Sequence, residues 1–211
     1  PSMEARALDS NTAWDLILQS VNRRNTTLPV DNDRQSALAI GENGQWQLHV
    51  AADPEARQLL TTFMPLCRYL PESAGPIVVG QMGQSLDGRI ATVTGASKYI
   101  NGEGGLRHLH RLRAVCDAVV VGAGTAAEDN PRLTVRLASG PNPVRVVIDR
   151  HRRVPQSHDI FTDAQSPTLH LVAGDYEPGA KGLPRTGVLE VPCLGDGEQT
   201  GPGRILQVLA D

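Results

Sequence analysis

A glycine-rich turn behind a short β-branched run is the first feature whose residue types could do chemistry. The run Val119-Val120-Val121 leads into Gly122-Ala123-Gly124-Thr125. Glycines at such a strand exit let the backbone approach a phosphate, which the amide groups and the Thr125 hydroxyl can then bind. Asp129-Asn130-Pro131 interrupts the segment within about two helical turns, which excludes the full crossover helix of a Rossmann unit. The turn predicts either a phosphate contact or simply a tight strand exit.

Arginine is concentrated in the middle of the chain. Residues 89–153 hold ten arginines and Lys98 against five carboxylates, a local charge of +6, whereas the whole chain carries −3. Guanidinium groups bind phosphate in a bidentate manner that lysine cannot match. A solvated basic face explains the charge equally well. Aromatic residues are only 3% of the chain and are not interleaved with basic ones, so we do not expect a nucleic-acid partner.

Further segments accompany the glycine turn in a fixed order. Ser85-Leu86-Asp87-Gly88-Arg89-Ile90-Ala91 contains a common Asp-Gly turn, and Ser97-Lys98-Tyr99-Ile100 follows it. After the glycine turn come Asp129-Asn130-Pro131-Arg132-Leu133-Thr134-Val135-Arg136 and Val144-Arg145-Val146-Val147-Ile148-Asp149. Each segment alone is a weak signal, but their occurrence together in this order is specific.

Taken together, these segments resemble the reductase domain of riboflavin biosynthesis, a pyrimidine reductase family with a dihydrofolate-reductase-like fold, over about residues 76–175. The resemblance implies a three-layer α/β fold with a mostly parallel central sheet. It also implies NADPH as cofactor, a phosphorylated pyrimidine as substrate and a homodimer. The deaminase often fused to this reductase is not expected here, because its His-x-Glu and Pro-Cys-x-x-Cys elements are missing.

The resemblance also assigns side chains to two ligands, position by position. Those implied on the cofactor side are Gly83, Tyr99, Gly122, Thr125, Asp129 and Arg150. Those implied on the substrate side are Ser97, Arg113, Leu133 and Arg136. The residue types suit several of these assignments. Arg113 and Arg136 can bind a ribose phosphate through bidentate hydrogen bonds, and Tyr99 can stack on a flat ring. A helix-surface salt bridge for Arg113 and ordinary packing for Leu133 are the competing interpretations.

The implied reaction is hydride transfer from NADPH to C1 of a ring-opened ribosylamine, which yields a ribityl chain. The protein must then hold the nicotinamide against that carbon, bind the phosphate and assist proton movement. Asp129 is the expected catalytic residue, in an electrostatic or proton-handling role. Arg150 stands where the family often has a small hydroxyl residue, and the cluster Arg150 to Arg153 could accept the 2′-phosphate of NADPH.

Two departures from the family pattern keep further functions in view. Gln81 occupies the position of a lysine in many members, and glutamine can hydrogen-bond but carries no charge. The chain ends after Ile205–Leu209, which resembles the helix preceding the strand that leads into the family's Glu-Gly-Gly or Glu-Ala-Gly loop. We therefore expect the reductase domain of this chain to lack its C-terminal strands and that loop. We therefore retain a related reductase acting on the diamino-pyrimidinone precursor or another pyrimidine or pteridine-like substrate. We also retain a non-catalytic NADPH-binding relative, a fragment, and a site that a partner completes.

The sequence predicts two parts that position these residues. Residues 1–74 form an accessory α+β module of unknown role. In it, Thr12–Asp15 begins a helix, Asn43-Gly44 turns a hairpin, and Asp53-Pro54 begins a second helix that Pro65 ends. Residues 75–211 form the reductase domain, with a helix over Gly105–Val115. Its buried parallel strands are expected at Ile77–Val79, Ala118–Val121, Val144–Ile148, Leu169–Val172 and Val188–Val191.

Composition limits the remaining possibilities. With 40% apolar and 20% charged residues the chain is of ordinary globular type. No apolar run approaches the roughly 20 residues that span a bilayer, and no signal pattern is present, so we expect a cytoplasmic protein without a membrane partner. The three cysteines are widely spaced, which predicts neither a disulfide framework nor a zinc site. His108 and His110 lie two apart on the predicted helix, make a poor metal pair and are both expected at the surface.

Overall fold

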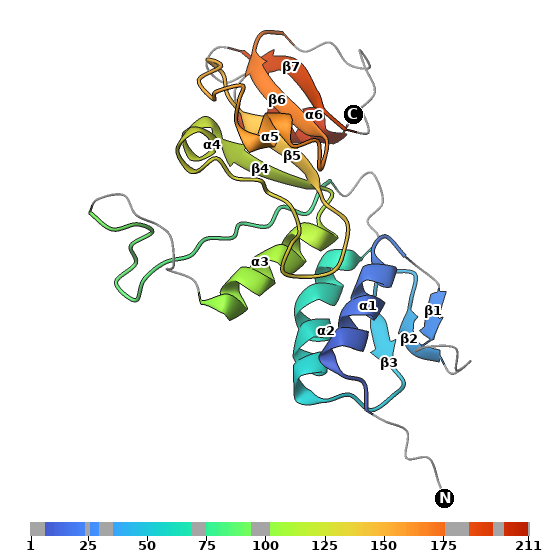
Figure 1. Ribbon diagram of the computed structural model, residues 1–211. Coiled ribbons are helices and arrows are strands. Elements are labelled where there is room, and N and C mark those ends of the chain that lie inside the picture. The colour runs from blue at the N-terminus through green and yellow to red at the C-terminus, as the bar shows by residue number, and fades with distance from the viewer. Residues whose placement is uncertain are drawn as a thin grey trace, which may run out of the picture. The chain divides into compact units, whose positions relative to one another are not determined.

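The computed structural model describes residues 7–23, 26–29, 36–68, 75–93, 102–175, 186–195 and 201–210. The chain divides into two compact units, residues 1–79 and 80–211, which carry the elements labelled in Figure 1. Among the residues described, no helix is both long enough and apolar enough to cross a membrane.

In its described residues, the first unit consists of two helices and a three-stranded antiparallel sheet (Figure 1). Its helices are α1 (Ser10–Ser20) and α2 (Pro54–Cys67). Its strands, in sheet order, are β1 (Thr26–Pro29), β2 (Ser36–Ile40) and β3 (Trp46–Leu48). The helices pack against each other, and Trp14 meets Phe63 edge to face with ring centroids 5.2 Å apart.

Two local signals in this unit are confirmed. Asp53 caps α2, because its carboxylate accepts the N–H of Ala56 at 2.7 Å, and Pro54 follows as the first helical residue. Gly44 has a φ of 72° in the turn between β2 and β3, and a Cβ there would lie 2.7 Å from the Cβ of Arg68. Glycine is therefore required at this turn by both conformation and space.

Two helix boundaries in this unit differ from the predicted ones. Helix α1 begins earlier than Thr12, because the carboxylate of Asp9 caps it by accepting from both the backbone N–H and the hydroxyl of Thr12. The predicted end of α2 at Pro65 is wrong, since the helix continues to Cys67. Met64 and Cys67 are only 3% and 2% exposed. Their burial offsets the backbone hydrogen bond that Pro65 cannot donate.

The second unit is built on a four-stranded parallel sheet. Its strands, in sheet order, are β4 (Ala118–Gly122), β5 (Val144–Ile148), β6 (Thr168–Ala173) and β7 (Val188–Leu194). Its helices are α3 (Glu103–Val115), α4 (Ala123–Asp129), α5 (Asp159–Thr162) and α6 (Pro202–Ala210). These four strands were all expected as parallel strands, and their boundaries agree within a few residues.

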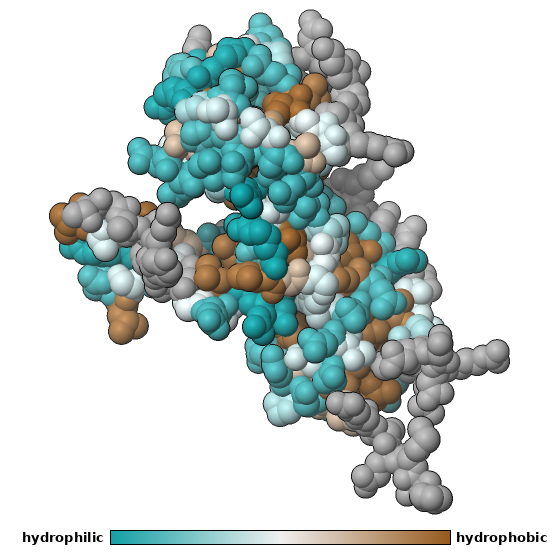
Figure 2. All heavy atoms as spheres, in the orientation of Figure 1, coloured by the Kyte–Doolittle hydropathy of each residue, from teal (hydrophilic) through white to brown (hydrophobic). Residues whose placement is uncertain are grey.

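Helices cover both faces of this sheet, which gives the expected three layers (Figure 1). Successive side chains of a strand point to opposite faces, and Val146 and Val147 of β5 accordingly belong to different cores. Val146 packs in a cluster with Val208 of α6. Val147 packs with Ala126 of α4 and Ile160 of α5. In the view of Figure 2 the surface over this layered part is mainly hydrophilic.

The predicted strand Ile77–Val79 is wrong. Residues 75–93 form neither helix nor strand, and Val78 and Met82 are 69% and 66% exposed. The sheet instead begins at β4, which pairs with β5. A three-residue apolar run that Gly80 ends has little strand preference of its own. A strand depends mainly on packing and pairing with a neighbour, which the sequence pattern cannot supply.

Candidate active site

The glycine turn lies at the carboxyl end of β4. The strand leads directly into α4, which has seven residues and ends at Asn130, whose φ is 41°. This confirms the expected truncated helix. A Cβ added to Gly122 or Gly124 would meet nothing within 4 Å, so the turn faces open space. Its backbone is therefore accessible to a ligand.

Thr125 and Asp129 extend this surface along α4. Both are exposed, as is Gly122. Residues four apart on a helix lie on the same face, so the Thr125 hydroxyl and the Asp129 carboxylate stand one turn apart on the exposed side. Three of the residues expected on the cofactor side are thus brought together.

Arg150 lies at the same edge of the sheet, after β5. Its Nη1 donates to the carbonyl oxygen of Gly195, which follows β7, and its own carbonyl accepts the N–H of Ala173 at 3.1 Å. These contacts tie the ends of β5, β6 and β7 together. The carboxyl ends of parallel strands are where open α/β sheets bind ligands. The position of Arg150 is therefore compatible with a ligand site.

The loop after β5 is fixed by a buried carboxylate. Asp149 is 0% exposed and accepts the N–H groups of Arg153 and Val154, each at 2.9 Å. His170 Nε2 lies 3.2 Å from the same carboxylate. Burial favours a higher pKa for Asp149, but the hydrogen bonds from Val154, Arg153 and His170 outweigh it and lower the pKa. Asp149 therefore holds the loop as a charged acceptor.

Arg152 in this loop already has a partner. Its guanidinium binds Glu190 of β7 through both carboxylate oxygens, at 2.7 and 3.1 Å. The hydrogen bond raises the pKa of Arg152 and lowers that of Glu190. Arg153 is exposed. Arg152 belongs to the basic cluster that we expected to bind a cofactor phosphate, but its charge is already neutralised by Glu190.

Two other arginines converge on one carbonyl group. Arg113, in the last turn of α3, donates from Nη1 to the Thr134 carbonyl oxygen at 3.3 Å. Arg136 donates from Nη1 to the same oxygen at 3.5 Å and to the Thr134 hydroxyl at 2.7 Å. Thr134 itself is 1% exposed. The two residues expected to bind the substrate phosphate therefore meet, although they are far apart in sequence.

The charges of this pair are uncompensated within the described part of the chain, where neither guanidinium forms a salt bridge. Burial lowers the pKa of Arg113, and the charge of Arg136 lowers it further. Arg113 Nε is buried and has no hydrogen-bond partner there. Two cations held together without an acid are suited to binding an anion. This excludes the surface salt bridge for Arg113 among these residues.

Leu133 lies in the hydrophobic core and has a left-handed backbone. It is 5% exposed, packs with Val147 and Ile160, and has a φ of 56°. This conformation is rare for a bulky residue and costs about 1–3 kcal/mol. The geometry therefore supports a packing role for Leu133. Its unusual backbone sets the direction of the Thr134 carbonyl that follows.

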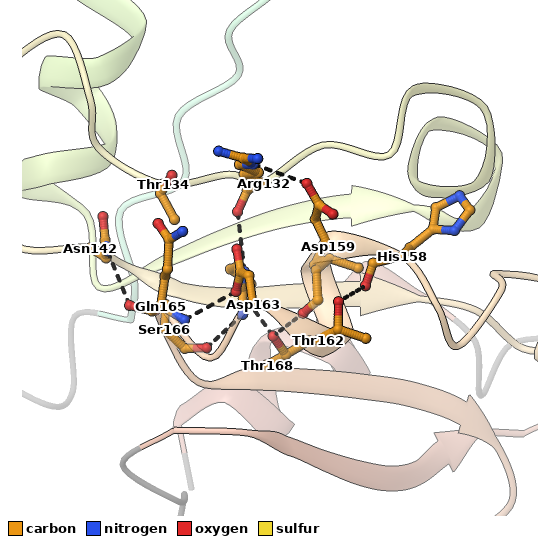
Figure 3. A network of polar contacts seen from close by, with 12 residues as sticks. Arg132, Thr134, Asn142, His158, Asp159, Thr162, Asp163, Gln165, Ser166 and Thr168 are labelled. Carbon is orange, nitrogen blue, oxygen red and sulfur yellow. Dashed lines mark hydrogen bonds and ion pairs between the residues drawn. The ribbon is translucent and has the colours of Figure 1, made fainter.

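Polar contacts on both sides of Leu133 hold this loop. The Asn130 side-chain oxygen accepts the N–H of Asp159 at 2.8 Å, and Arg132 pairs with the Asp159 carboxylate at 2.9 Å. The Asn142 side-chain oxygen accepts the N–H of Val135 at 2.7 Å. Figure 3 shows Arg132, Thr134 and Asn142 within this network.

Arg145 is the buried centre of the network, and sequence reasoning missed it. This β5 residue is 1% exposed, and its guanidinium binds the Asp163 carboxylate at 2.7 Å and the carbonyls of Ser166 and Arg132 at 2.7 and 3.3 Å. Its Nε donates to the Thr168 hydroxyl at 3.0 Å. The signal was an arginine inside a β-branched run, since a buried charge must be paired.

His110 is a second residue that the sequence placed wrongly. It is 4% exposed rather than at the surface, and its Nδ1 accepts the backbone N–H of Arg136 at 2.9 Å. The reason is tertiary: the loop after α4 returns to the last turns of α3, where Arg113 also binds it. Helical periodicity contains no signal for a loop that covers one end of a helix.

Of the remaining expected site residues, Gly83 lies among those that the structure describes. Gly83 lies in the segment 75–93, outside the sheet, and is half-exposed. Ser97 and Tyr99 lie outside the described residues. Gln81 is exposed. In the described ranges, no three histidine, cysteine, aspartate or glutamate side chains are grouped as a metal site would require.

Comparisons with known proteins agree on one family. Residues 76–180 match the model of the RibD C-terminal domain. A 2,5-diamino-6-ribosylamino-4(3H)-pyrimidinone 5′-phosphate reductase of Methanothermobacter thermautotrophicus is 46% identical over 106 residues, 49% of this chain and 48% of that protein. The riboflavin biosynthesis protein RibD of Aquifex aeolicus is 33% identical over 130 residues, 61% of this chain and 35% of that protein.

A solved structure supports the fold. The diaminohydroxyphosphoribosylaminopyrimidine deaminase/5-amino-6-(5-phosphoribosylamino)uracil reductase of Thermotoga maritima is 29% identical and matches with a TM-score of 0.51. The match covers 74% of this chain and 40% of that one. The chain thus spans about half, or less, of the length of the proteins that it matches.

Proposed function

Because the chain belongs, through residues 76–180, to the RibD C-terminal domain family, we propose that it is a pyrimidine reductase of riboflavin biosynthesis. In this proposal it reduces the ribosyl group of 5-amino-6-(5-phosphoribosylamino)uracil with NADPH and releases the ribityl product. The observation that carries the proposal is the convergence of Arg113 and Arg136 on the carbonyl oxygen of Thr134.

A phosphate monoester fits this arginine pair. Its oxygens can accept from both guanidinium groups. Burial and, after it, the charge of Arg136 lower the pKa of Arg113, and a bound negative charge offsets both effects. Hydrogen bonds to charged groups contribute about 1.5–3 kcal/mol each. Ser97 is a further substrate contact by resemblance. Leu133 would act indirectly, because its backbone conformation sets the direction of the Thr134 carbonyl.

The residues at the carboxyl edge of the sheet fit a dinucleotide. Gly122 and Gly124 leave open space for a phosphate, and the hydroxyl of Thr125 is exposed beside them. Gly83, Tyr99 and Arg150 are assigned to the same ligand by resemblance. When bound there, NADPH supplies the hydride. The protein's own tasks are to orient the two ligands, exclude water and handle the proton.

Asp129 is the residue that we propose for electrostatic or proton-handling catalysis. It is exposed in the last turn of α4, one turn from Thr125. A carboxylate there can stabilise positive charge that develops near the nicotinamide, or accept a proton during opening of the ribosyl ring. Its place beside the glycine turn supports the first of these roles.

A second substrate is favoured by the names of the relatives. The proteins 46% and 41% identical over 106 and 108 residues are 2,5-diamino-6-ribosylamino-4(3H)-pyrimidinone 5′-phosphate reductases. The diamino-pyrimidinone phosphate is therefore the second candidate substrate. Both substrates carry the ribosyl phosphate that the arginine pair would bind, so the pair does not distinguish them.

The exposed Gln81, at the position of a family lysine, favours two further functions. One is reduction of another pyrimidine or a pteridine-like substrate, and the second is NADPH binding without catalysis. A homodimer is proposed from the resemblance alone, and a cytoplasmic location from the absence of a long apolar run in the sequence.

The test is NADPH oxidation by the purified chain with each of the two phosphorylated substrates, with NADH and the dephosphorylated compounds as controls. We expect NADPH oxidation that depends on the phosphate. The substrate with the higher kcat/KM identifies the reaction. NADPH binding without turnover on either compound would instead support a non-catalytic relative, and turnover by a longer chain alone would identify this one as a fragment.

A further inference from the structure

We propose that His110 is a positioning residue of the phosphate site, which holds the backbone of Arg136 so that its guanidinium lies beside that of Arg113. The inference rests on the proposed function, since the ligand of the pair is taken to be the substrate's phosphate. It assigns a role to a buried side chain that the reaction itself does not use.

The geometry is a two-point attachment of a loop to a helix. His110 and Arg113 are three residues apart on α3 and therefore share a face. His110 Nδ1 accepts the N–H of Arg136 at 2.9 Å, and Arg113 donates to the Thr134 carbonyl at 3.3 Å. One helix face thus binds a donor and an acceptor of the same short loop. This fixes both the position and the rotation of the Arg136 backbone.

The effect of this attachment reaches the Arg136 side chain. Arg136 is exposed, and its Nη1 lies 2.7 Å from the Thr134 hydroxyl. Without a fixed backbone, an exposed arginine would lose more conformational entropy on binding an anion. The contact with His110 therefore prepares the guanidinium for its ligand before the ligand arrives.

The contact also defines the chemical state of His110. Nδ1 accepts a hydrogen bond, so the ring is neutral and carries its proton on Nε2. Burial lowers the pKa of His110 to about 4, and the charges of Arg113 and Arg136 act in the same direction. The ring therefore remains an acceptor at neutral pH and adds no third positive charge below the pair.

A merely structural histidine would behave differently. If His110 only fills space, its substitution lowers stability but leaves phosphate affinity unchanged in the folded fraction. If His110 positions Arg136, phosphate affinity should be retained only by a substituted side chain that places a hydrogen-bond acceptor at the position of Nδ1. Asparagine places a side-chain oxygen close to that position, whereas leucine fills the space without an acceptor. His110→Asn and His110→Leu are therefore the matched pair.

The experiment measures the affinity of the whole chain for inorganic phosphate by calorimetry, and KM and kcat for the phosphorylated substrate. We expect His110→Leu to weaken phosphate binding and raise KM about tenfold, the loss of one hydrogen bond, with kcat changed less than about twofold. His110→Asn should restore most of the affinity. Should His110→Leu fail to fold, His110→Gln, whose amide reaches the Nε2 rather than the Nδ1 position, replaces it.

Equal phosphate affinity of the wild type and His110→Leu, or equal loss in His110→Asn and His110→Leu, would overturn the inference. The proposed function is tested separately by the wild type. If the wild-type chain binds phosphate and turns over substrate but His110 variants behave alike, only the role of His110 is wrong. If the wild-type chain does neither, the proposed function is wrong and the role of His110 falls with it.

Discussion

Arg113 and Arg136 donate to the same oxygen atom, the carbonyl oxygen of Thr134, at 3.3 and 3.5 Å. Two guanidinium groups that share one acceptor repel each other, and burial of Arg113 strengthens the effect. A fold does not gain stability from such a pair. Sites that bind anions accept this cost, because the ligand supplies the missing charge.

Arg136→Gln should therefore weaken phosphate binding without lowering the stability of the fold. The variant loses the hydrogen bond to the Thr134 hydroxyl but also the repulsion from Arg113, so we expect its Tm in phosphate-free buffer to be close to that of the wild type. The rise in Tm on adding inorganic phosphate should be largely lost. Arg107→Gln, which removes an exposed arginine from the first turns of α3, is the control and should keep that rise. A phosphate response in Arg136→Gln equal to the control's would contradict the assignment.

The left-handed backbone of Leu133 predicts that a glycine variant at this position will be no less stable than an alanine variant, the reverse of the usual order. Leu133→Ala should lower the free energy of unfolding by about 2–5 kcal/mol, because a buried leucine is truncated. Glycine is normally worse than alanine, but at a φ of 56° it carries no left-handed penalty. We expect Leu133→Gly to be at least as stable as Leu133→Ala in urea unfolding. A clearly less stable glycine variant would show that the left-handed backbone imposes no cost.

The sheet and the glycine turn could be predicted because their signals are local. Short runs rich in valine, leucine or isoleucine define β4 to β7, and the residues Asp129-Asn130-Pro131 explain why α4 is short. The segment Ile77–Val79 is also an apolar run, but it pairs with no strand among the residues that the structure describes, so its pattern led to a wrong prediction. Secondary structure that depends on a partner is not encoded in the segment alone.

The candidate site was predictable only in part, for a related reason. Arg113 and Arg136 followed from the resemblance, and the structure brings them together. His110 and Arg145 were missed because their partners come from other elements: the backbone of Arg136 for His110, and Asp163 for Arg145. A buried polar residue is recognised by its partners, and these become visible only when the fold is known.

The ion pair between Arg145 and Asp163 should be far more sensitive to substitution than the pair between Arg132 and Asp159. Arg145 is 1% exposed, so Asp163→Asn leaves a buried charge without its partner and should cost about 3–5 kcal/mol of unfolding free energy. The second pair is solvent-exposed, and Asp159→Asn should change stability little. Urea denaturation of both variants measures the difference. Equal effects would mean that the Arg145 charge is not buried in solution.

Asp129 can be tested against its neighbour Glu128. Asp129→Asn keeps the size and hydrogen-bonding capacity of the side chain but removes its charge, so we expect kcat to fall about 10²-fold or more if the group handles a proton. Glu128→Gln removes an adjacent exposed charge on α4 and should retain kcat. Single-turnover rates and the Kd for NADPH should be measured for both. If Asp129→Asn retains both kcat and NADPH affinity, Asp129 has no catalytic role.

His110 should give the chain a specific loss of stability in mild acid. Its pKa is about 4 in the folded protein and about 6.5 in an unfolded chain. Between these values the unfolded chain binds a proton that the folded protein does not. As pH falls from about 6.5 to about 4, stability should therefore decrease by up to about 1.4 kcal/mol per pH unit. Above this window both states are neutral at His110, and the contribution disappears.

His110→Asn removes the titrating group and should flatten this part of the stability curve. The depressed pKa of Asp149 makes its contribution disappear mainly below pH 4, outside the window, and the subtraction of the two curves removes it in any case. Urea unfolding at intervals between pH 7 and pH 4 provides the measurement. Parallel curves for the wild type and His110→Asn would show that His110 accepts a proton in the folded state as readily as in the unfolded one. The ring would then be charged below the arginine pair, and the hydrogen bond from Arg136 would be lost in mild acid.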